Sequence, residues 1–138
     1  MKPTIYLDNS ATTRICDEAL ETYVQISKEH FGNPSSLHSV GQEAKEALDA
    51  ARATVAECLG CEPREIIFTS GGSEADNQAI ISAARYGERK GKKHIISTAF
   101  EHHAVLHTLQ KLEKEGFEVT YLDVHQGHNV TAQQVKDA

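Results

Sequence analysis

The second half of the chain alternates short apolar runs with helical patterns, and this alternation restricts the fold more than any other feature. Apolar runs between turn residues predict buried strands, and apolar residues at 3,4 spacing after each run predict helices. The predicted strands are 65–69, 94–98 and 117–122, and the predicted helices begin near residues 73, 102 and 131. Such an alternation favours a parallel α/β sheet with right-handed crossovers.

The first half carries helical patterns on either side of a loop. Apolar spacing predicts one helix from residue 17 to about 31, and a second from about 39 to 59 that Gly60 ends. Between them, residues 32–36 (GNPSS) form a dense cluster of turn residues.

The last predicted helix is short. After a predicted turn at 125–128, Thr131 and Gln134 resemble a capping box that opens this helix, and the chain reaches Ala138 about two turns later. The predicted strands are also fewer than the roughly five or six of an average sheet. We therefore expect the chain to stop within a fold that continues beyond it.

Composition favours a globular, cytoplasmic protein. Of the 138 residues, 39% are hydrophobic and 25% are charged, which is ordinary for a folded domain. With 14 Lys+Arg against 20 Asp+Glu, the net charge of -6 offers no basic footprint for nucleic acid or an anionic membrane. No window approaches the ~18 apolar residues of a membrane span, and the N-terminus lacks the apolar run of a signal peptide.

The three cysteines, Cys16, Cys58 and Cys61, do not predict a disulfide framework, because their number is odd and no secretion signal is recognised. The Cys58–Cys61 pair has redox spacing, but it follows a helix that Gly60 ends, where the helix dipole disfavours a thiolate. A zinc site needs about four ligands, and no second pair exists. Since free cysteine is usually buried, we expect these residues to be structural and unreactive.

Residues 69–74 (TSGGSE) join a predicted strand to a predicted helix. Glycines let backbone N–H groups approach an anion, and the helix N-terminus adds partial positive charge. Ser73 could donate its hydroxyl to the same anion. The turn is neither a Walker A loop nor a dinucleotide fingerprint. An ordinary turn with Ser73 as the helix N-cap explains the pattern equally well.

A histidine-rich segment, residues 101–107 (EHHAVLH), follows the next predicted strand. Open α/β sheets bind ligands at strand carboxyl ends, so His102 is expected on the same sheet edge as the glycine turn. A neutral imidazole there could stack on a flat ring or pass protons. His103 and His107 are one helical turn apart, but without further ligands of known placement we expect exposed histidines and no metal.

Taken together, the motifs resemble the N-terminal part of the cysteine desulfurases of the NifS/IscS type, in the class V aminotransferase family. The likeness covers essentially the whole chain and rests on motifs in the family's order. They are YLDNSATT (6–13), FGNPSSLH (31–38), IFTSGGSEADN (67–77) and EHHAVL (101–106).

The resemblance implies the N-terminal part of a three-layer, fold-type I large domain that binds pyridoxal 5′-phosphate (PLP), a mostly parallel sheet with flanking helices. Residues 1–15 would border the active site, and residues 16–138 would form the partial large domain. Such enzymes are homodimers that take sulfur from L-cysteine, leave alanine, and hold the sulfur as a persulfide. The sulfur passes to an acceptor or scaffold protein for iron–sulfur cluster or thio-cofactor assembly.

Carried over by position, Gly72 and Ser73 would bind the PLP phosphate. His102 would stack over the pyridine ring as a catalytic and cofactor-binding residue. Thr12 and Asn33 would border the substrate.

This chain departs from the family's pattern in two places. The phosphate turn reads GGSE where the family commonly has GATE, and serine can still donate to phosphate. The Schiff-base lysine, the acidic partner of the pyridine nitrogen and the persulfide-forming cysteine lie further along the family's chain and match nothing here. We therefore expect this chain alone to be inactive.

Other functions stay open at this point. The chain could be an inactive truncated homologue that binds a phosphate ligand or a partner protein. Selenocysteine lyases and kynureninases share the architecture and form a further alternative.

Overall fold

The computed structural model describes residues 5–123 and 129–138. The chain divides into two compact units, Met1–Ile67 and Phe68–Ala138, which are treated separately below. The turn predicted at 125–128 lies outside the described residues. The division expected after residue 15 stays a prediction.

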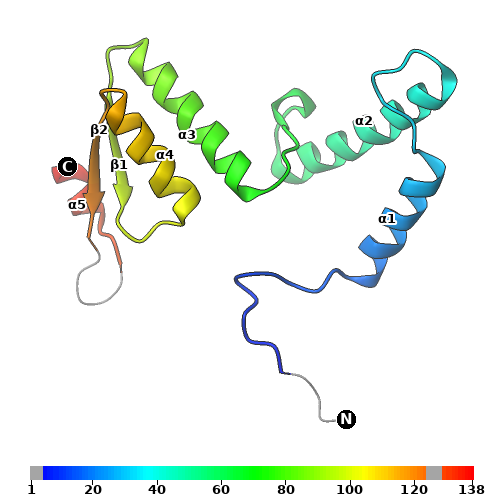
Figure 1. The fold of residues 1–138 in the computed structure, drawn as a ribbon, viewed down its shortest axis with the longest axis horizontal. Helices are drawn as coiled ribbons and strands as arrows, with labels where there is room; N and C mark the ends of the chain where they lie inside the picture. Colours follow the sequence, from blue (N-terminus) through cyan, green and yellow to red (C-terminus); the bar gives the residue numbers. More distant parts are fainter. Residues whose placement is uncertain (1–4, 124–128) are drawn as a thin grey trace. The chain divides into compact units, whose positions relative to one another are not determined.

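The first unit contains the helices α1 (Asp17–Glu29) and α2 (Ser39–Leu59), followed by the short 3₁₀ helix η1 (Pro63–Glu65; Figure 1). The predicted bounds of α2 are confirmed, and both ends have a local cause. Nδ1 of His38 accepts the Gly41 N–H at 3.3 Å and caps the N-terminus. Gly60 ends the helix at φ 67° and ψ 35°, a left-handed conformation that a Cβ disfavours.

The loop between α1 and α2 needs glycine for space and not for its backbone angle. A Cβ on Gly32 would lie 2.2 Å from the Val40 carbonyl oxygen. A Cβ on Gly41, which is buried at the start of α2, would lie 2.5 Å from the Ser36 carbonyl oxygen. Asn33 stabilises the loop, because its Oδ1 accepts the Ser35 N–H at 2.9 Å.

The strand predicted at 65–69 is wrong. η1 is opened by a capping box between Glu62 and Glu65 and ends at Glu65. Residues 66–69 have no regular structure. Ile67 is 62% exposed and Phe68 is 48% exposed, so the run is not buried among the described residues. A strand requires hydrogen bonds from a neighbouring strand, and the sheet formed by the described residues does not include this segment.

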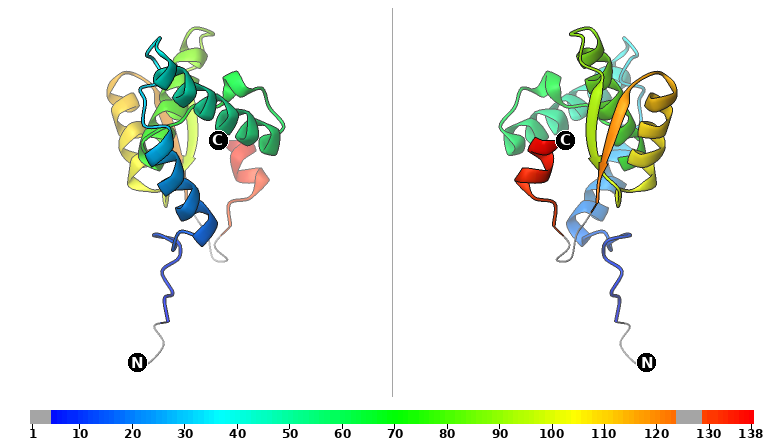
Figure 2. Two further views of the ribbon diagram at one scale, coloured as in Figure 1. Left: turned by 90° about the vertical axis from the view of Figure 1, so that its right-hand side faces the viewer. Right: turned by 90° about the vertical axis from the view of Figure 1, so that its left-hand side faces the viewer.

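The second unit consists of α3 (Gly72–Glu88), β1 (His94–Thr98), α4 (His103–Lys114), β2 (Glu118–Leu122) and α5 (Ala132–Asp137). The strands are parallel and side by side (Figure 2), with His94 opposite Glu118 and Thr98 opposite Leu122. The predicted strand–helix alternation is therefore confirmed from α3 onward. The described part of the sheet is β1 and β2 only.

The core of the second unit lies where α3 and α4 meet the start of β2. Leu112 is 1% exposed, Phe117 5% and Ala84 6%, and the half-buried Ile80 and Ile95 pack against them. α3 packs mainly against α4, so these helices hold each other in register.

Charged side chains cover the Phe117 ring. Arg85 pairs with Glu88 at 3.0 Å and with Glu115, and Lys93 pairs with Glu88 at 2.8 Å. The Arg85 guanidinium and the Lys93 ammonium lie 5.6 and 5.5 Å from the ring centroid, which is cation–π range. The cluster links the end of α3 with the starts of β1 and β2.

The capping box at the start of α5 is confirmed. The Gln134 N–H donates to the Thr131 hydroxyl at 3.2 Å, and Oε1 of Gln134 accepts the Thr131 N–H at 2.9 Å. The Gln134 side chain also donates to the Asp123 carbonyl oxygen at 3.1 Å.

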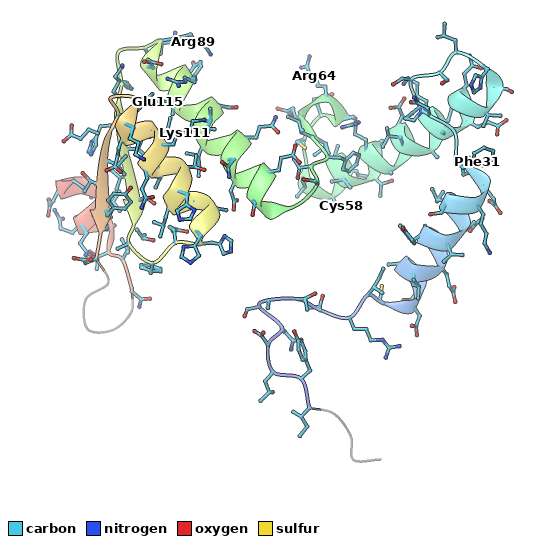
Figure 3. All side chains as sticks on the ribbon, viewed as in Figure 1. Phe31, Cys58, Arg64, Arg89, Lys111 and Glu115 are labelled. Atoms are coloured by element: carbon cyan, nitrogen blue, oxygen red, sulfur yellow. The ribbon has the colours of Figure 1, made fainter. Side chains whose placement is uncertain are left out.

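The expected burial of the cysteines is wrong. Cys16 and Cys58 are exposed and Cys61 is half-buried, all three as free thiols. Cys58 lies in the last turn of α2 (Figure 3) and is not among the buried residues of that helix. Among the described helices, none is both long and apolar enough to cross a membrane.

Candidate active site

The N-terminus of α3 presents unpaired backbone donors in an open position. Gly71 is the N-cap, and the first helical hydrogen bond runs from the Ala75 N–H to the Gly71 carbonyl at 3.1 Å. The N–H groups of Gly72, Ser73 and Glu74 therefore have no helical acceptor. Among the described residues, nothing lies within 4 Å of a Cβ built on Gly71 or Gly72, so a ligand can approach the backbone.

The interpretation of Ser73 as N-cap is wrong, because the helix begins at Gly72 and Gly71 occupies the N-cap position. The Ser73 hydroxyl is consequently not required as a cap. It is exposed at the helix terminus, where the positive end of the helix dipole favours an anion.

The Glu74 carboxylate is directed back to the turn. Its Oε2 accepts the Ser70 hydroxyl at 2.6 Å and the Ser70 N–H at 2.7 Å. These hydrogen bonds, the one from the hydroxyl first, hold the pKa of Glu74 below its ordinary value. The carboxylate thus fixes the turn that precedes the helix.

His102 caps α4 with its own ring. Nδ1 accepts the Ala104 N–H at 3.1 Å, and His102 has the extended backbone conformation of an N-cap residue. A ring nitrogen that accepts a hydrogen bond carries no proton, so the neutral ring bears its proton on Nε2. The exposed Nε2–H is the atom that His102 can offer to a ligand.

Asn77 connects α3 to α4 from the interior. Its Nδ2 donates to the Ser73 carbonyl at 2.6 Å and to the Ala104 carbonyl at 3.3 Å. The Thr108 hydroxyl lies 2.6 Å from Oδ1 of Asn77 and 2.8 Å from the Ala104 carbonyl oxygen. Thr108 is only 3% exposed and Asn77 is half-buried, so the hydrogen bonds of the Thr108 hydroxyl are partly shielded from water.

These elements enclose one cleft of about 370 Å³. Its lining residues are Ser73, Asn77, His102, His103, Ala104, His107, Thr108 and Lys111. The structure thus brings Ser73, from the glycine turn before α3, and His102 to one cleft. The packing of α3 on α4 does this, and not a shared edge of strands, since the strand expected before the turn does not form.

The remaining histidines line the same cleft. The His103 and His107 rings stack with centroids 5.5 Å apart at 24°. The described residues contain no group of three or more metal-ligating side chains that could hold a metal ion. Lys111 follows one turn later on α4 (Figure 3) and supplies a positive charge to the cleft lining.

Asn77, Thr108 and Lys111 were not identified from the sequence. Asn77 follows Ser73 by four residues, and Lys111 follows His107 by four, so each pair shares a helix face. That spacing was the available signal, although it does not show that two helices pack together.

The other predicted site residues, Thr12 and Asn33, belong to the first unit. Both are exposed, and the Thr12 N–H donates to the Asp8 carbonyl at 3.5 Å in a turn. Their expected place beside a substrate stays a prediction.

Comparisons with known proteins agree on one family. The model of the family described as Aminotransferase class-V matches residues 5–138. The chain is 50% identical to the cysteine desulfurase IscS of Clostridium botulinum, over 100% of this chain and 34% of that protein. The IscS of Methanosarcina thermophila is 48% identical over 97% of this chain and 33% of that protein.

A solved structure described as SspA in complex with cysteine has a TM-score of 0.86 and 38% identity. The match covers 98% of this chain and 39% of the chain in that structure. The chain thus spans about a third of the length of the curated relatives it matches.

Proposed function

Because the chain belongs to the class V aminotransferase family, we propose that it is the N-terminal part of a PLP-dependent cysteine desulfurase. The complete enzyme takes sulfur from L-cysteine, leaves alanine, and holds the sulfur as a persulfide for iron–sulfur cluster or thio-cofactor assembly. The relatives named cysteine desulfurase support the reaction, and the neighbour solved with cysteine supports the substrate.

One observation carries the proposal: Ser73, whose N–H has no helical acceptor, and the His102 imidazole line the same cleft. The phosphate of PLP fits the N-terminus of α3, where Gly72 and Ser73 offer backbone N–H groups and Ser73 adds a hydroxyl. The cleft volume of about 370 Å³ lies within the usual range for small-molecule sites. The donors present therefore suit a phosphate-bearing cofactor.

The exposure of His102 supports stacking of its imidazole on a flat ring. His102 is exposed in the cleft, and its cap on α4 fixes the ring through Nδ1. Stacked on the pyridine ring, the imidazole would exclude water from one ring face. Its Nε2 would hold or transfer a proton at the reacting centre.

PLP, when bound, supplies the electron sink for bond breaking next to the substrate's α-carbon. In this chain, Gly72 and Ser73 bind the phosphate, and His102 orients the ring. Thr12 and Asn33 border the substrate. The covalent lysine and the persulfide-forming cysteine belong to the part of the family's chain that these residues do not match.

The proposal includes a cytoplasmic homodimer that passes sulfur to an acceptor or scaffold protein. No direct contact with nucleic acid or membrane is proposed.

The experiment uses the complete protein that carries this chain, purified and loaded with PLP. Alanine and, after reduction with dithiothreitol, sulfide are measured with L-cysteine as substrate, and we expect them in equal amounts. Selenocysteine and kynurenine are tested in parallel. Turnover of either of these without turnover of cysteine would contradict the proposal, as would the absence of alanine.

A variant and a matched control tie the activity to the cleft. His102→Ala is expected to lower alanine formation at least ~100-fold, a typical contribution of a positioned proton-transfer group. His94→Ala removes an exposed histidine of the same unit whose ring contacts Thr120 at 2.8 Å, and it is expected to retain activity. Equal losses in the two variants would assign the effect to general stability.

A further inference from the structure

The Asn77 side chain links the first turn of α3, which follows the glycine turn, to the first turn of α4, which follows His102. Its Nδ2 faces the carbonyl oxygens of Ser73 and Ala104, at 2.6 and 3.3 Å. Carbonyl oxygens only accept hydrogen bonds, so the orientation of the amide follows from its neighbours. One side chain therefore contacts both the cofactor-facing end of α3 and the first turn of α4.

Ala104 is held on both sides. Its carbonyl oxygen accepts from Asn77 and lies 2.8 Å from the Thr108 hydroxyl, while its N–H donates to the His102 ring at 3.1 Å. A continuous path of hydrogen bonds thus runs from the Ser73 carbonyl through Asn77 and Ala104 to the His102 ring.

A buried hydroxyl anchors the Asn77 amide within this path. Thr108 is 3% exposed, and its hydroxyl lies 2.6 Å from Oδ1 of Asn77, so rotation of the amide would leave shielded polar atoms without partners. Ser73 and His102, at the two ends of the path, are exposed and free to contact a ligand. A shielded anchor between exposed binding groups is the arrangement expected of a positioning device.

We propose that Asn77, held by Thr108, is a positioning residue that sets the place of His102 relative to the phosphate-binding turn. The inference rests on the proposed function, because the turn is taken to bind phosphate and His102 to stack on the cofactor. Asn77 itself is assigned no contact with cofactor or substrate. The two helices each provide one half of the cofactor cleft, and Asn77 fixes their spacing where the halves meet.

The test removes the hydroxyl that holds the amide. Thr108→Val keeps the shape of the side chain, and Thr108→Ser restores the hydroxyl. The matched control is Thr22→Val, because the Thr22 hydroxyl donates to the Glu18 carbonyl one turn back at 2.8 Å but makes no bond between helices. Asn77→Ala is the second variant, should Thr108→Val fail to fold.

The first readout needs no ligand. In the complete protein without added PLP, the ¹⁵N shifts of the His102 ring and the hydrogen exchange of the Ala104 amide are measured by NMR. We expect exchange about five- to tenfold faster in Thr108→Val, the change that corresponds to losing about one hydrogen bond. Thr108→Ser and Thr22→Val are expected to match the parent.

The second readout is the dissociation constant for PLP, followed by ³¹P NMR. We expect it to rise about five- to tenfold in Thr108→Val and to recover in Thr108→Ser. Folded Thr108→Val or Asn77→Ala with parental Ala104 exchange and His102 shifts would overturn the inference. Failure of the parent to form alanine from cysteine would refute the proposed function, while the ligand-free readout would still decide the role of Asn77.

Discussion

The proposed function gives His102 two separable roles, and the substitutions His102→Asn and His102→Ala distinguish them. The ring caps α4 through Nδ1, and its exposed part faces the cleft. Asparagine is among the preferred N-cap residues, so His102→Asn keeps an acceptor for the Ala104 N–H while it removes the ring. Alanine removes both the acceptor and the ring.

Typical energies of a side-chain cap and of ring stacking give the size of each effect. Loss of a side-chain cap costs about 1 kcal/mol of stability, so His102→Ala is expected to lower the free energy of unfolding by that amount. Loss of ring stacking is worth about 0.5–1.5 kcal/mol, which corresponds to PLP binding about two- to twelvefold weaker. His102→Asn should show the weaker binding with nearly unchanged stability, and His102→Ala should show both changes.

Denaturant unfolding measures the first quantity, and titration of the complete apoprotein with PLP measures the second. Parental PLP affinity in His102→Asn would refute a stacking role for the ring. A stability loss in His102→Asn as large as that in His102→Ala would show that asparagine does not replace the cap.

Three further predictions concern other parts of the chain. The Ser70 hydrogen bonds that lower the pKa of Glu74 should stabilise the turn above the ordinary glutamate pKa and be lost as pH falls through the lowered value; Ser70→Ala should raise the NMR-measured carboxyl pKa. Leu112→Ala should reduce the free energy of unfolding by about 2–4 kcal/mol because Leu112 is 1% exposed, whereas Leu59→Ala, at 69% exposed, should cost less than about 1 kcal/mol. A thiol reagent should modify the exposed Cys58 at the rate of an unfolded peptide; strong protection of that thiol would contradict the exposure found here.

Local signals located the helices well. The bounds of α2 followed from apolar spacing and Gly60, and the start of α5 followed from Thr131 and Gln134. Each of these signals acts within a few residues of the chain, through caps and turn conformations that the sequence itself encodes.

The segment at 65–69 shows where local signals fail. Its apolar composition is that of a buried strand, yet Ile67 and Phe68 are exposed and the segment has no strand partner among the described residues. Composition measures suitability for a sheet, whereas strand formation depends on a partner that is distant in sequence. The prediction that the cysteines are buried failed for a similar reason, because burial depends on what packs against a residue and not on its type.

The sequence by itself determined the bounds of α2, the start of α5, the parallel order of β1 and β2, and the motifs that place the chain in its family. Only the tertiary structure decided that Ser73 and His102 line one cleft and that Asn77 joins the first turns of α3 and α4. Helix boundaries depend on neighbours along the chain. The cleft depends on the packing of α3 against α4, which brings residues about thirty positions apart in sequence into hydrogen-bond contact.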